Sequence, residues 1–412
     1  MINGGIPDED DLIFDWNAAE GSPAPPGVQF DDETLRDGIQ SPSVRDPGIE
    51  DKLRILHLMA ELGIDAADLG LPGASERQQR DVGRMLEEVE RERLDIFPNC
   101  AARTLISDIA PICDVADSVG IAVEIACFIG SSPIRQYAEE WDLDRMLHHT
   151  EEAVSYAVSR GMPVMYVTED TTRARPETLR RLYTAAIEAG AGRICVCDTV
   201  GHVTPAGVAA LISFIKTVVE DSGEQVVIDW HGHRDRGLDI ANTLAALAAG
   251  ASRVHGTALG IGERSGNTPM DLLLVNCRLL GWIDNDLSRL REYCETVSRA
   301  TGVPIPFNYP IIGPDAFRTA TGVHAAAVIK ARNKGAAWLA DRVYCGVPAG
   351  MVGRSQRIEV GPMSGASNVE CWMREQGLEP RAERVAAVLA AAKAADHVLS
   401  AEEIAAVLED IA

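Results

Sequence analysis

Two histidines separated by a single glycine are the residues of this chain whose spacing is best suited to chemistry. His231 and His233 follow the apolar, β-branched run at residues 226–228, from which Asp229 and Trp230 separate them, and such a run is typical of a β-strand. Because side chains alternate along an extended strand, residues two apart point the same way and can share one metal ion. Taken alone, such a pair is more often exposed or hydrogen-bonded than ligating, so its meaning depends on where the strand falls in the chain.

Composition and charge limit the class of protein. The 412 residues are 46% hydrophobic and 24% charged, as in globular proteins that bury a large core. Nine scattered cysteines form no disulfide framework and favour a reducing cytoplasm, and Cys195 and Cys197 are interpreted as small apolar side chains of a buried strand. The net charge of −24 argues against nucleic acid or an anionic membrane as a partner. No apolar run reaches the roughly 20 residues that cross a bilayer, and the first residues do not resemble a signal peptide.

Short apolar runs alternate with longer segments of helical spacing. The runs lie at residues 28–30, 66–72, 95–100, 122–128, 164–170, 193–199, 226–233 and 253–260, and helical segments include residues 51–62, 143–159 and 205–220. Eight such units in about 250 residues predict an α/β protein with a (β/α)₈ (TIM) barrel. An open doubly wound sheet usually has a glycine-rich phosphate loop after its first strand, and the segment DDETLRDGIQ found there has none.

The extent of this alternation of strands and helices divides the chain into three regions. Residues 1–27 are acidic and rich in proline and glycine, which predicts a flexible N-terminal arm. Residues 28–285 form the barrel, and residues 286–412 form a linker and a mostly helical C-terminal region. There we expect a helix within residues 319–335 that carries His324, and two alanine-rich helices in residues 380–412, the second opened by a capping box from Ser400 to Glu403.

Barrel enzymes place their chemistry at the C-terminal ends of the strands. Polar residues collect at these predicted ends: Asp32, Arg36, Asp37, Asp68, Arg103, Ser132, Glu169, Asp170, Arg173, Asp198, Thr199, His231 and His233, followed by the loop GIGERSGN at residues 260–267. In a closed barrel only the eighth strand separates the first from the seventh, so Asp37 can meet the two histidines.

A carboxylate and two imidazoles without a nearby thiolate suit a divalent ion such as Mg²⁺, Mn²⁺, Zn²⁺ or Co²⁺. So few protein ligands leave coordination positions open, which indicates a catalytic site. A 2-oxo acid can fill those positions through its keto oxygen and one carboxylate oxygen, and the ion then acts as a Lewis acid on the ketone.

Seven motifs in order resemble one family of enzymes. DETLRDGIQ, SSPI, TEDTTR, DTVG, DWHGHRDRG, GIGERSGN and GVH…Y…MVGR, spread over about residues 28–365, are similar to those of the 2-isopropylmalate, homocitrate and citramalate synthases. The resemblance implies an acyltransferase that condenses acetyl-CoA or a related acyl-CoA with a 2-oxo acid in a metal-dependent Claisen reaction. Thioester hydrolysis then gives a 2-hydroxy dicarboxylic acid and CoA, in carboxylic acid metabolism and amino-acid biosynthesis.

The resemblance also implies roles for single residues. Asp37, His231, His233 and Asn267 are expected at the metal, and the acyl-CoA is expected at the loop residues Gly260, Gly262, Glu263 and Arg264. Catalytic roles fall to Arg36, Glu169, His324 and Tyr344, although the identity of the base stays open. The substrate pocket is expected to include Arg36, Asp68, Arg103, Ser132, Thr199 and Arg234. In this family the histidine and tyrosine that follow the barrel usually enter the neighbouring subunit's site, which implies a homodimer with shared active sites.

Some features leave alternatives open. The chain departs from the family pattern around the substrate, at Ile39, Gly232, Arg234, Leu259 and Thr319. A metal-dependent C–C lyase or aldolase of the same superfamily is one alternative, although the loop at residues 260–267 lacks the cysteine of hydroxymethylglutaryl-CoA lyases. A barrel that binds without catalysing is another. The remaining histidines are interpreted as structural or surface residues: His57, His148, His149, His202, His255 and His397.

Overall fold

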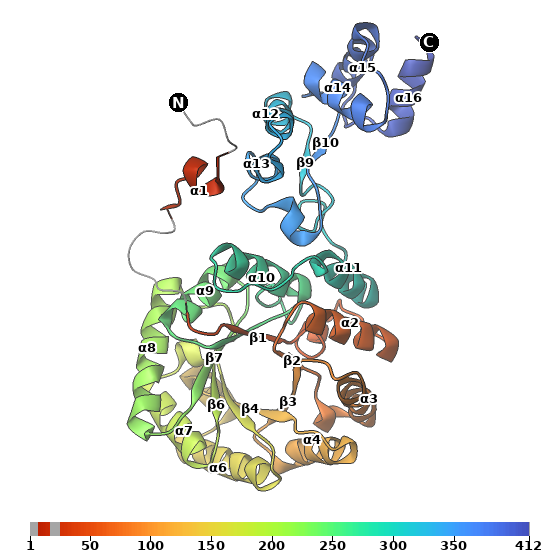
Figure 1. Ribbon diagram of the computed structural model, residues 1–412. Helices are drawn as coiled ribbons and strands as arrows, with labels where there is room; N and C mark the ends of the chain where they lie inside the picture. Colours follow the sequence, from red (N-terminus) through yellow and green to blue (C-terminus); the bar gives the residue numbers. More distant parts are fainter. Residues whose placement is uncertain (1–6, 17–24, 412) are drawn as a thin grey trace. The chain divides into compact units, whose positions relative to one another are not determined.

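The computed structural model describes residues 7–16 and 25–411 (Figure 1). The chain divides into two compact units, one formed by Ser22–Pro304 and the other by Met1–Gly21 together with Ile305–Ala412. In the described residues, no helix combines the length and the apolar character that crossing a membrane requires.

The larger unit is a closed barrel of eight parallel strands with helices around it, which confirms the predicted fold (Figure 1). The strands are β1 (Gln29–Asp32), β2 (Ala66–Asp68), β3 (Phe97–Arg103), β4 (Glu124–Gly130), β5 (Val164–Glu169), β6 (Arg193–Asp198), β7 (Val227–Gly232) and β8 (Arg253–Gly256). They pair in sequence order, and β8 closes the barrel against β1, with Phe30 opposite Val254. This closure leaves β8 as the single strand between β1 and β7.

Helices connect consecutive strands. They are α2 (Ile49–Glu61), α3 (Glu76–Glu92), α4 (Ile106–Val119), α5 (Pro133–Glu139), α6 (Leu143–Ser159), α7 (Pro176–Glu188), α8 (Pro205–Ser222) and α9 (Asp239–Ala249), with α10 (Met270–Leu279) after β8. Side chains cap some of these helices at their N-termini. At the start of α6 the Asp142 carboxylate accepts a hydrogen bond of 2.8 Å from the backbone N–H of Arg145. Gly250 ends α9 with a φ of +117°, a conformation that glycine adopts without strain.

The barrel unit continues beyond the boundary expected at residue 285. Helix α11 (Leu290–Thr301) packs on the barrel, and its Tyr293 hydroxyl donates to the buried Asp32 carboxylate at the end of β1. Tyr293 is itself fully buried and also lies 3.2 Å from the Thr34 hydroxyl. This buried polar contact joins α11 to β1, and the barrel unit accordingly extends to Pro304.

Charged side chains fill the N-terminal end of the barrel interior. Arg253, which is 2% exposed, donates to Asp229 at 2.7 Å and also to Glu124. Arg193 lies 2.6 Å from the other oxygen of Asp229. These residues stand at or near the starts of β4, β6, β7 and β8, so opposite charges compensate one another where burial alone would be costly.

The second unit is mostly helical. It contains α1 (Glu9–Leu12), α12 (Gly322–Asn333), α13 (Ala337–Arg342), α14 (Ala366–Glu375), α15 (Ala382–Ala394) and α16 (Ala401–Glu409), with a two-stranded sheet of β9 (Arg318–Thr319) and β10 (Arg357–Ile358). His324 lies on α12, and the backbone N–H of Glu403 donates to the Ser400 hydroxyl at 3.2 Å in the expected capping box. Much of the N-terminal arm, residues 1–6 and 17–24, lies outside the described residues.

Candidate active site

A cavity of about 250 Å³ lies inside the barrel and has two chemically different walls. One, the polar wall, comes from the ends of β1, β7 and β8 and consists of Glu33, Arg36, Asp37, His231, His233 and His255. The other, the apolar wall, comes from β3 to β6 and the segment after β2, and consists of Leu71, Ala101, Ala126, Phe128, Met165, Val167, Cys195 and Cys197. Further lining residues are Gln40, Glu169, Thr199, Glu263 and Arg264.

Asp37, His231 and His233 converge on the polar wall as the sequence predicts. The Nε2 atoms of His231 and His233 lie 4.0 Å and 3.9 Å from Oδ2 of Asp37. These separations are too long for hydrogen bonds, yet donor atoms that contact one ion at about 2.1 Å each must lie within about 4.2 Å of one another. All three side chains are buried. The arrangement therefore fits a divalent ion.

Asn267 supplies a further observation that fits an ion. Its Nδ2 donates to Asp37 Oδ1 at 2.8 Å, while its buried Oδ1 has no hydrogen-bond partner among the described residues. A buried amide oxygen without a partner is costly, and a cation beside it removes that cost. Residue 262 must be glycine here because a Cβ at Gly262 would lie 2.2 Å from Asn267 Nδ2, on a backbone with φ of +148°.

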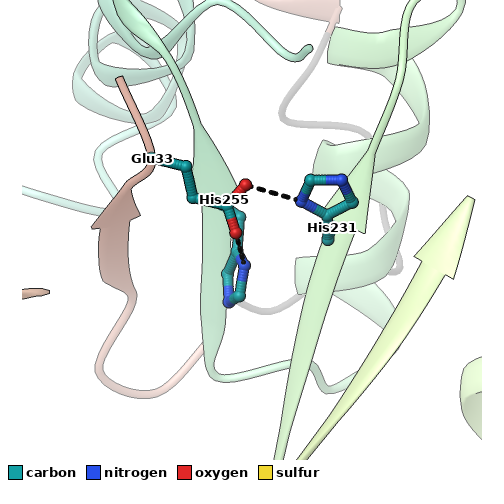
Figure 2. Close-up of side chains that lie close together, drawn as sticks. All are labelled: Glu33, His231 and His255. Carbon is teal, nitrogen blue, oxygen red and sulfur yellow. Dashed lines mark hydrogen bonds and ion pairs between the residues drawn. The ribbon is translucent and has the colours of Figure 1, made fainter. Parts of the chain in front are cut away.

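A second cluster shares His231 but has a different character. Glu33 Oε2 lies 3.0 Å from His231 Nδ1, and Glu33 Oε1 lies 2.8 Å from His255 Nδ1 (Figure 2). These contacts are at hydrogen-bonding distance, so pairing of the Glu33 carboxylate with the two imidazoles accounts for this cluster without an ion. His231 thus turns one nitrogen to Glu33 and the other to Asp37.

The electrostatics favour the ligand forms of these groups. Burial alone would raise the pKa of Asp37, but the positive charges around it, Arg36 the largest of them, outweigh burial and hold that pKa below its ordinary value. Burial, together with the neighbouring His231, lowers the pKa of His233 to about 4. At neutral pH the carboxylate is ionised and the imidazole of His233 is neutral, which are the forms that bind metals.

Arg36 is fixed by three carboxylates. Its Nε donates to Asp68 at 2.7 Å, its Nη1 to Asp37 at 2.9 Å, and its Nη2 lies 2.9 Å from Glu33. The contacts with Asp68 and Asp37 are hydrogen bonds and use two of the five N–H donors of the guanidinium, while the contact with Glu33 is an ion pair. Asp68 therefore positions Arg36, and it does not line the cavity itself. Burial raises the pKa of Asp68 to about 7.

Glu169 lies at the end of β5, where its side chain is 34% exposed. Burial raises the pKa of this carboxyl, although Arg135, whose Nη2 lies 3.6 Å from Glu169 Oε2, acts in the opposite direction. The Thr199 hydroxyl, also at the cavity, accepts a hydrogen bond of 2.8 Å from the backbone N–H of Asp170. A carboxylate with a raised pKa is a stronger base, which suits proton transfer.

The other predicted site residues fall into three groups: those of the loop after β8 with Arg234, two that point away from the cavity, and two in the second unit. Glu263 and Arg264 line the cavity, and Gly260 lies against Arg234, whose Nη1 would be 2.5 Å from a Cβ there. Arg103 and Ser132 do not line it: Arg103 is exposed and pairs with Asp108 at 2.6 Å, and the buried Ser132 hydroxyl donates to Asp170 and caps α5. His324 and Tyr344 belong to the second unit, where their ring centroids are 4.3 Å apart.

Sequence reasoning missed two residues of the polar wall. Glu33 received no role, and His255 was expected to be structural or on the surface, whereas it lines the cavity and is 2% exposed. The sequence offers no local signal for either residue, because the direction of the β8 side chains is known only once the barrel is formed.

Comparisons with known proteins agree with this architecture. The family model described as HMGL-like matches residues 27–297. A homocitrate synthase of Methanopyrus kandleri is 34% identical, with 88% of this chain and 86% of the relative covered, and a 2-isopropylmalate synthase of Sulfurisphaera tokodaii is 34% identical, with 85% and 86% covered. The solved HMG-CoA lyase of Bacillus subtilis is similar in fold, with a TM-score of 0.57 at 19% identity over 69% of this chain and 96% of the lyase.

Fold and site together define a barrel enzyme with a candidate metal centre at the C-terminal ends of its strands. The chain belongs to the HMGL-like family. Within that family it is an enzyme of the same type as the 2-isopropylmalate and homocitrate synthases, which match it over most of its length.

Proposed function

We propose that this enzyme condenses acetyl-CoA, or a related acyl-CoA, with a 2-oxo acid, and that water then hydrolyses the thioester to release CoA and a 2-hydroxy dicarboxylic acid. The observation that carries the proposal is the convergence of Asp37, His231 and His233 beside Arg36, in a chain whose relatives are named as synthases of this kind. Bound by these ligands, with Asn267 as a fourth, a divalent ion would supply Lewis acidity toward a ketone.

The side chains around the centre have complementary tasks. The N–H groups of Arg36 that donate neither to Asp68 nor to Asp37 can stabilise negative charge that develops on the acceptor's oxygen. Glu169 is our candidate to take the proton from the acyl group's α-carbon, supported by His324 and Tyr344. Thr199 can donate its hydroxyl to the acceptor's carboxylate, and the loop that contains Glu263 and Arg264 would receive the acyl-CoA.

The apolar wall supports a finer proposal about the acceptor. Small residues of β3 to β6, including Ala101, Ala126 and Cys197, leave space for a side chain. An aliphatic side chain gains about 1.5–3 kcal/mol when fully buried. A second carboxylate placed there would be desolvated without a cationic partner, which costs several kcal/mol. We therefore propose a 2-oxo acid with an uncharged aliphatic side chain.

An acceptor panel tests both statements. Metal-loaded enzyme with acetyl-CoA should release free thiol faster with 3-methyl-2-oxobutanoate or 2-oxobutanoate than with 2-oxoglutarate, by at least about tenfold in kcat/KM for roughly 1.4 kcal/mol of discrimination. Faster release with 2-oxoglutarate would overturn the assignment of the apolar wall. Cleavage of a hydroxyacyl-CoA without any condensation would favour the lyase, and no turnover of either kind would favour a barrel that only binds.

We further propose a homodimer in which His324 and Tyr344 complete the active site of the neighbouring subunit. These two residues lie together on the second unit, while Glu169 lies on the barrel. Mixing inactive His324→Ala with inactive Glu169→Ala subunits should restore about one quarter of the activity, because half the dimers are mixed and each has one intact site.

The control is a mixture of His324→Ala with Tyr344→Ala subunits. Both substitutions damage the same contribution, so every site in the mixed dimer is defective and no activity should return. Absence of recovery in the first mixture, after subunit exchange has been demonstrated by mass, would contradict shared sites.

A further inference from the structure

We propose that Cys195 and Cys197 form a second metal site, which binds a soft divalent ion such as Zn²⁺ or Cd²⁺ through two sulfur atoms. Both residues lie on β6 and line the apolar wall of the cavity. Their Sγ atoms lie 3.8 Å apart, and both are free cysteines. The pair is separate from Asp37, His231 and His233, which belong to the polar wall.

The two thiols meet because side chains alternate along β6. Residues two apart on a strand point to the same face, and here the two cysteines pack with Ala101, Ala126 and Met165 inside the barrel. Such residues are about 6.6 Å apart along the strand, which is close to the limit of about 6.8 Å between Cα atoms that a disulfide spans. An ion between the sulfurs, in contrast, joins them without moving the strand.

The distance between the sulfurs matches that of two ligands on one tetrahedral ion. Thiolates bind Zn²⁺ at about 2.3 Å, so two of them at the tetrahedral angle are about 3.8 Å apart. The Sγ atoms of Cys195 and Cys197 already have this separation. Sulfur ligands select soft ions, whereas Mg²⁺ and Mn²⁺ prefer oxygen. Mg²⁺ or Mn²⁺ at Asp37 would therefore leave the two thiols free.

The charge of the occupied site suits the apolar wall. Burial raises the pKa of Cys195, so its thiol is neutral when no ion is bound. A divalent ion displaces one proton from each thiol, and the two thiolates then cancel its two positive charges. Because the ion and the two sulfurs together carry no net charge, their burial among apolar side chains costs far less than that of a free ion.

An ion held by the two sulfurs would also affect the acceptor, and this step rests on the proposed function. Two protein ligands leave two positions of a tetrahedral ion open toward the cavity. The ion would occupy space in the wall where we place the acceptor's aliphatic side chain, beside Ala101 and Ala126. A soft ion is therefore expected to inhibit condensation by competing with the 2-oxo acid.

Titration of the full-length protein with Cd²⁺, in excess Mg²⁺, tests the site. Binding by thiolates gives an ultraviolet sulfur-to-cadmium charge-transfer band, which oxygen and nitrogen ligands do not give. Loss of a ligand's hydrogen-bond partner already weakens metal binding by about 10–100-fold. Loss of a ligand itself costs more, so Cys197→Ser should weaken the binding that produces this band by more than about 100-fold.

The matched control is Cys345→Ser, because Cys345 is a half-buried thiol of the second unit, outside the cavity. This variant should keep the band, with a Cd²⁺ affinity within about twofold of that of the unaltered protein. A band that Cys197→Ser retains at full affinity would overturn the proposal.

A second measurement leaves the pair itself unaltered. X-ray absorption at the zinc edge of Cys345→Ser protein with two equivalents of Zn²⁺ should show sulfur ligands at about 2.3 Å from the metal. Oxygen and nitrogen ligands alone would overturn the proposal.

The metal site and the proposed reaction can fail separately. In the thiol-release assay, Cd²⁺ should raise the KM for the 2-oxo acid, and Cys197→Ser should need more than about 100-fold more Cd²⁺ for the same effect. A decrease in kcat without a change in KM would contradict overlap with the acceptor. If the band depends on Cys197 but no acceptor gives condensation, the metal site stands and the proposed function fails.

Discussion

A His233→Ala variant is expected to lose its metal ion and at least about three orders of magnitude in kcat/KM, which equals the several kcal/mol that a Lewis-acid ion supplies. The Nε2 of His233 lies 3.9 Å from Asp37 Oδ2 on the side of the cavity, so its removal leaves an incomplete ligand set. Metal content after dialysis, determined by mass spectrometry, and thiol release from acetyl-CoA measure the two effects.

His202→Ala is the control for this variant. His202 follows β6 at the same end of the barrel, yet its side chain is exposed and does not line the cavity. Its replacement should leave metal content and turnover unchanged. A His233→Ala protein that retains a full equivalent of metal after dialysis would refute the ligand assignment.

The barrel and the centre of the site follow from sequence because they depend on short-range periodicity and on topology. Alternation along β7 places His231 and His233 on one side, and barrel closure places β1 near β7. The prediction that Asp37 lies beside the two histidines therefore requires only the correct number of strands. The capping box at Ser400 is equally local, and the structure confirms it.

The remaining polar wall depends on contacts that no local pattern encodes. His255 lies in a run that resembles an ordinary buried strand, and its partner Glu33 is 222 residues away. Arg103 is the opposite case, a residue that the sequence places at the site but that does not line the cavity. Asp108, five residues further on, pairs with its guanidinium and holds the side chain away. A residue's position at a strand end thus predicts where the backbone lies, while its neighbours decide where the side chain points.

The charged side chains inside the barrel are expected to contribute strongly to the stability of the fold and to its dependence on pH. Burial would raise the pKa of Asp229, but Arg253, His255 and Arg193 outweigh it and lower that pKa to about 2. Because the folded value lies below the ordinary 3.8, the stability that Asp229 contributes is present above about pH 4 and is lost as the pH falls toward 2.

Arg253→Met is expected to lower the free energy of unfolding by about 3–5 kcal/mol at neutral pH, because it leaves Asp229 and Glu124 buried with one cation fewer. The pKa of Asp229 should then rise, so acid unfolding should begin at a higher pH than in the unaltered protein.

The matched control is the Arg160→Met variant. Arg160 also contacts two aspartates, Asp114 and Asp117, but at the surface, so the urea midpoint of this variant should hardly differ from that of the unaltered protein. Urea unfolding at pH 7 and pH 4 measures both effects, and equal midpoints for the two variants would contradict a stabilising role of the interior network.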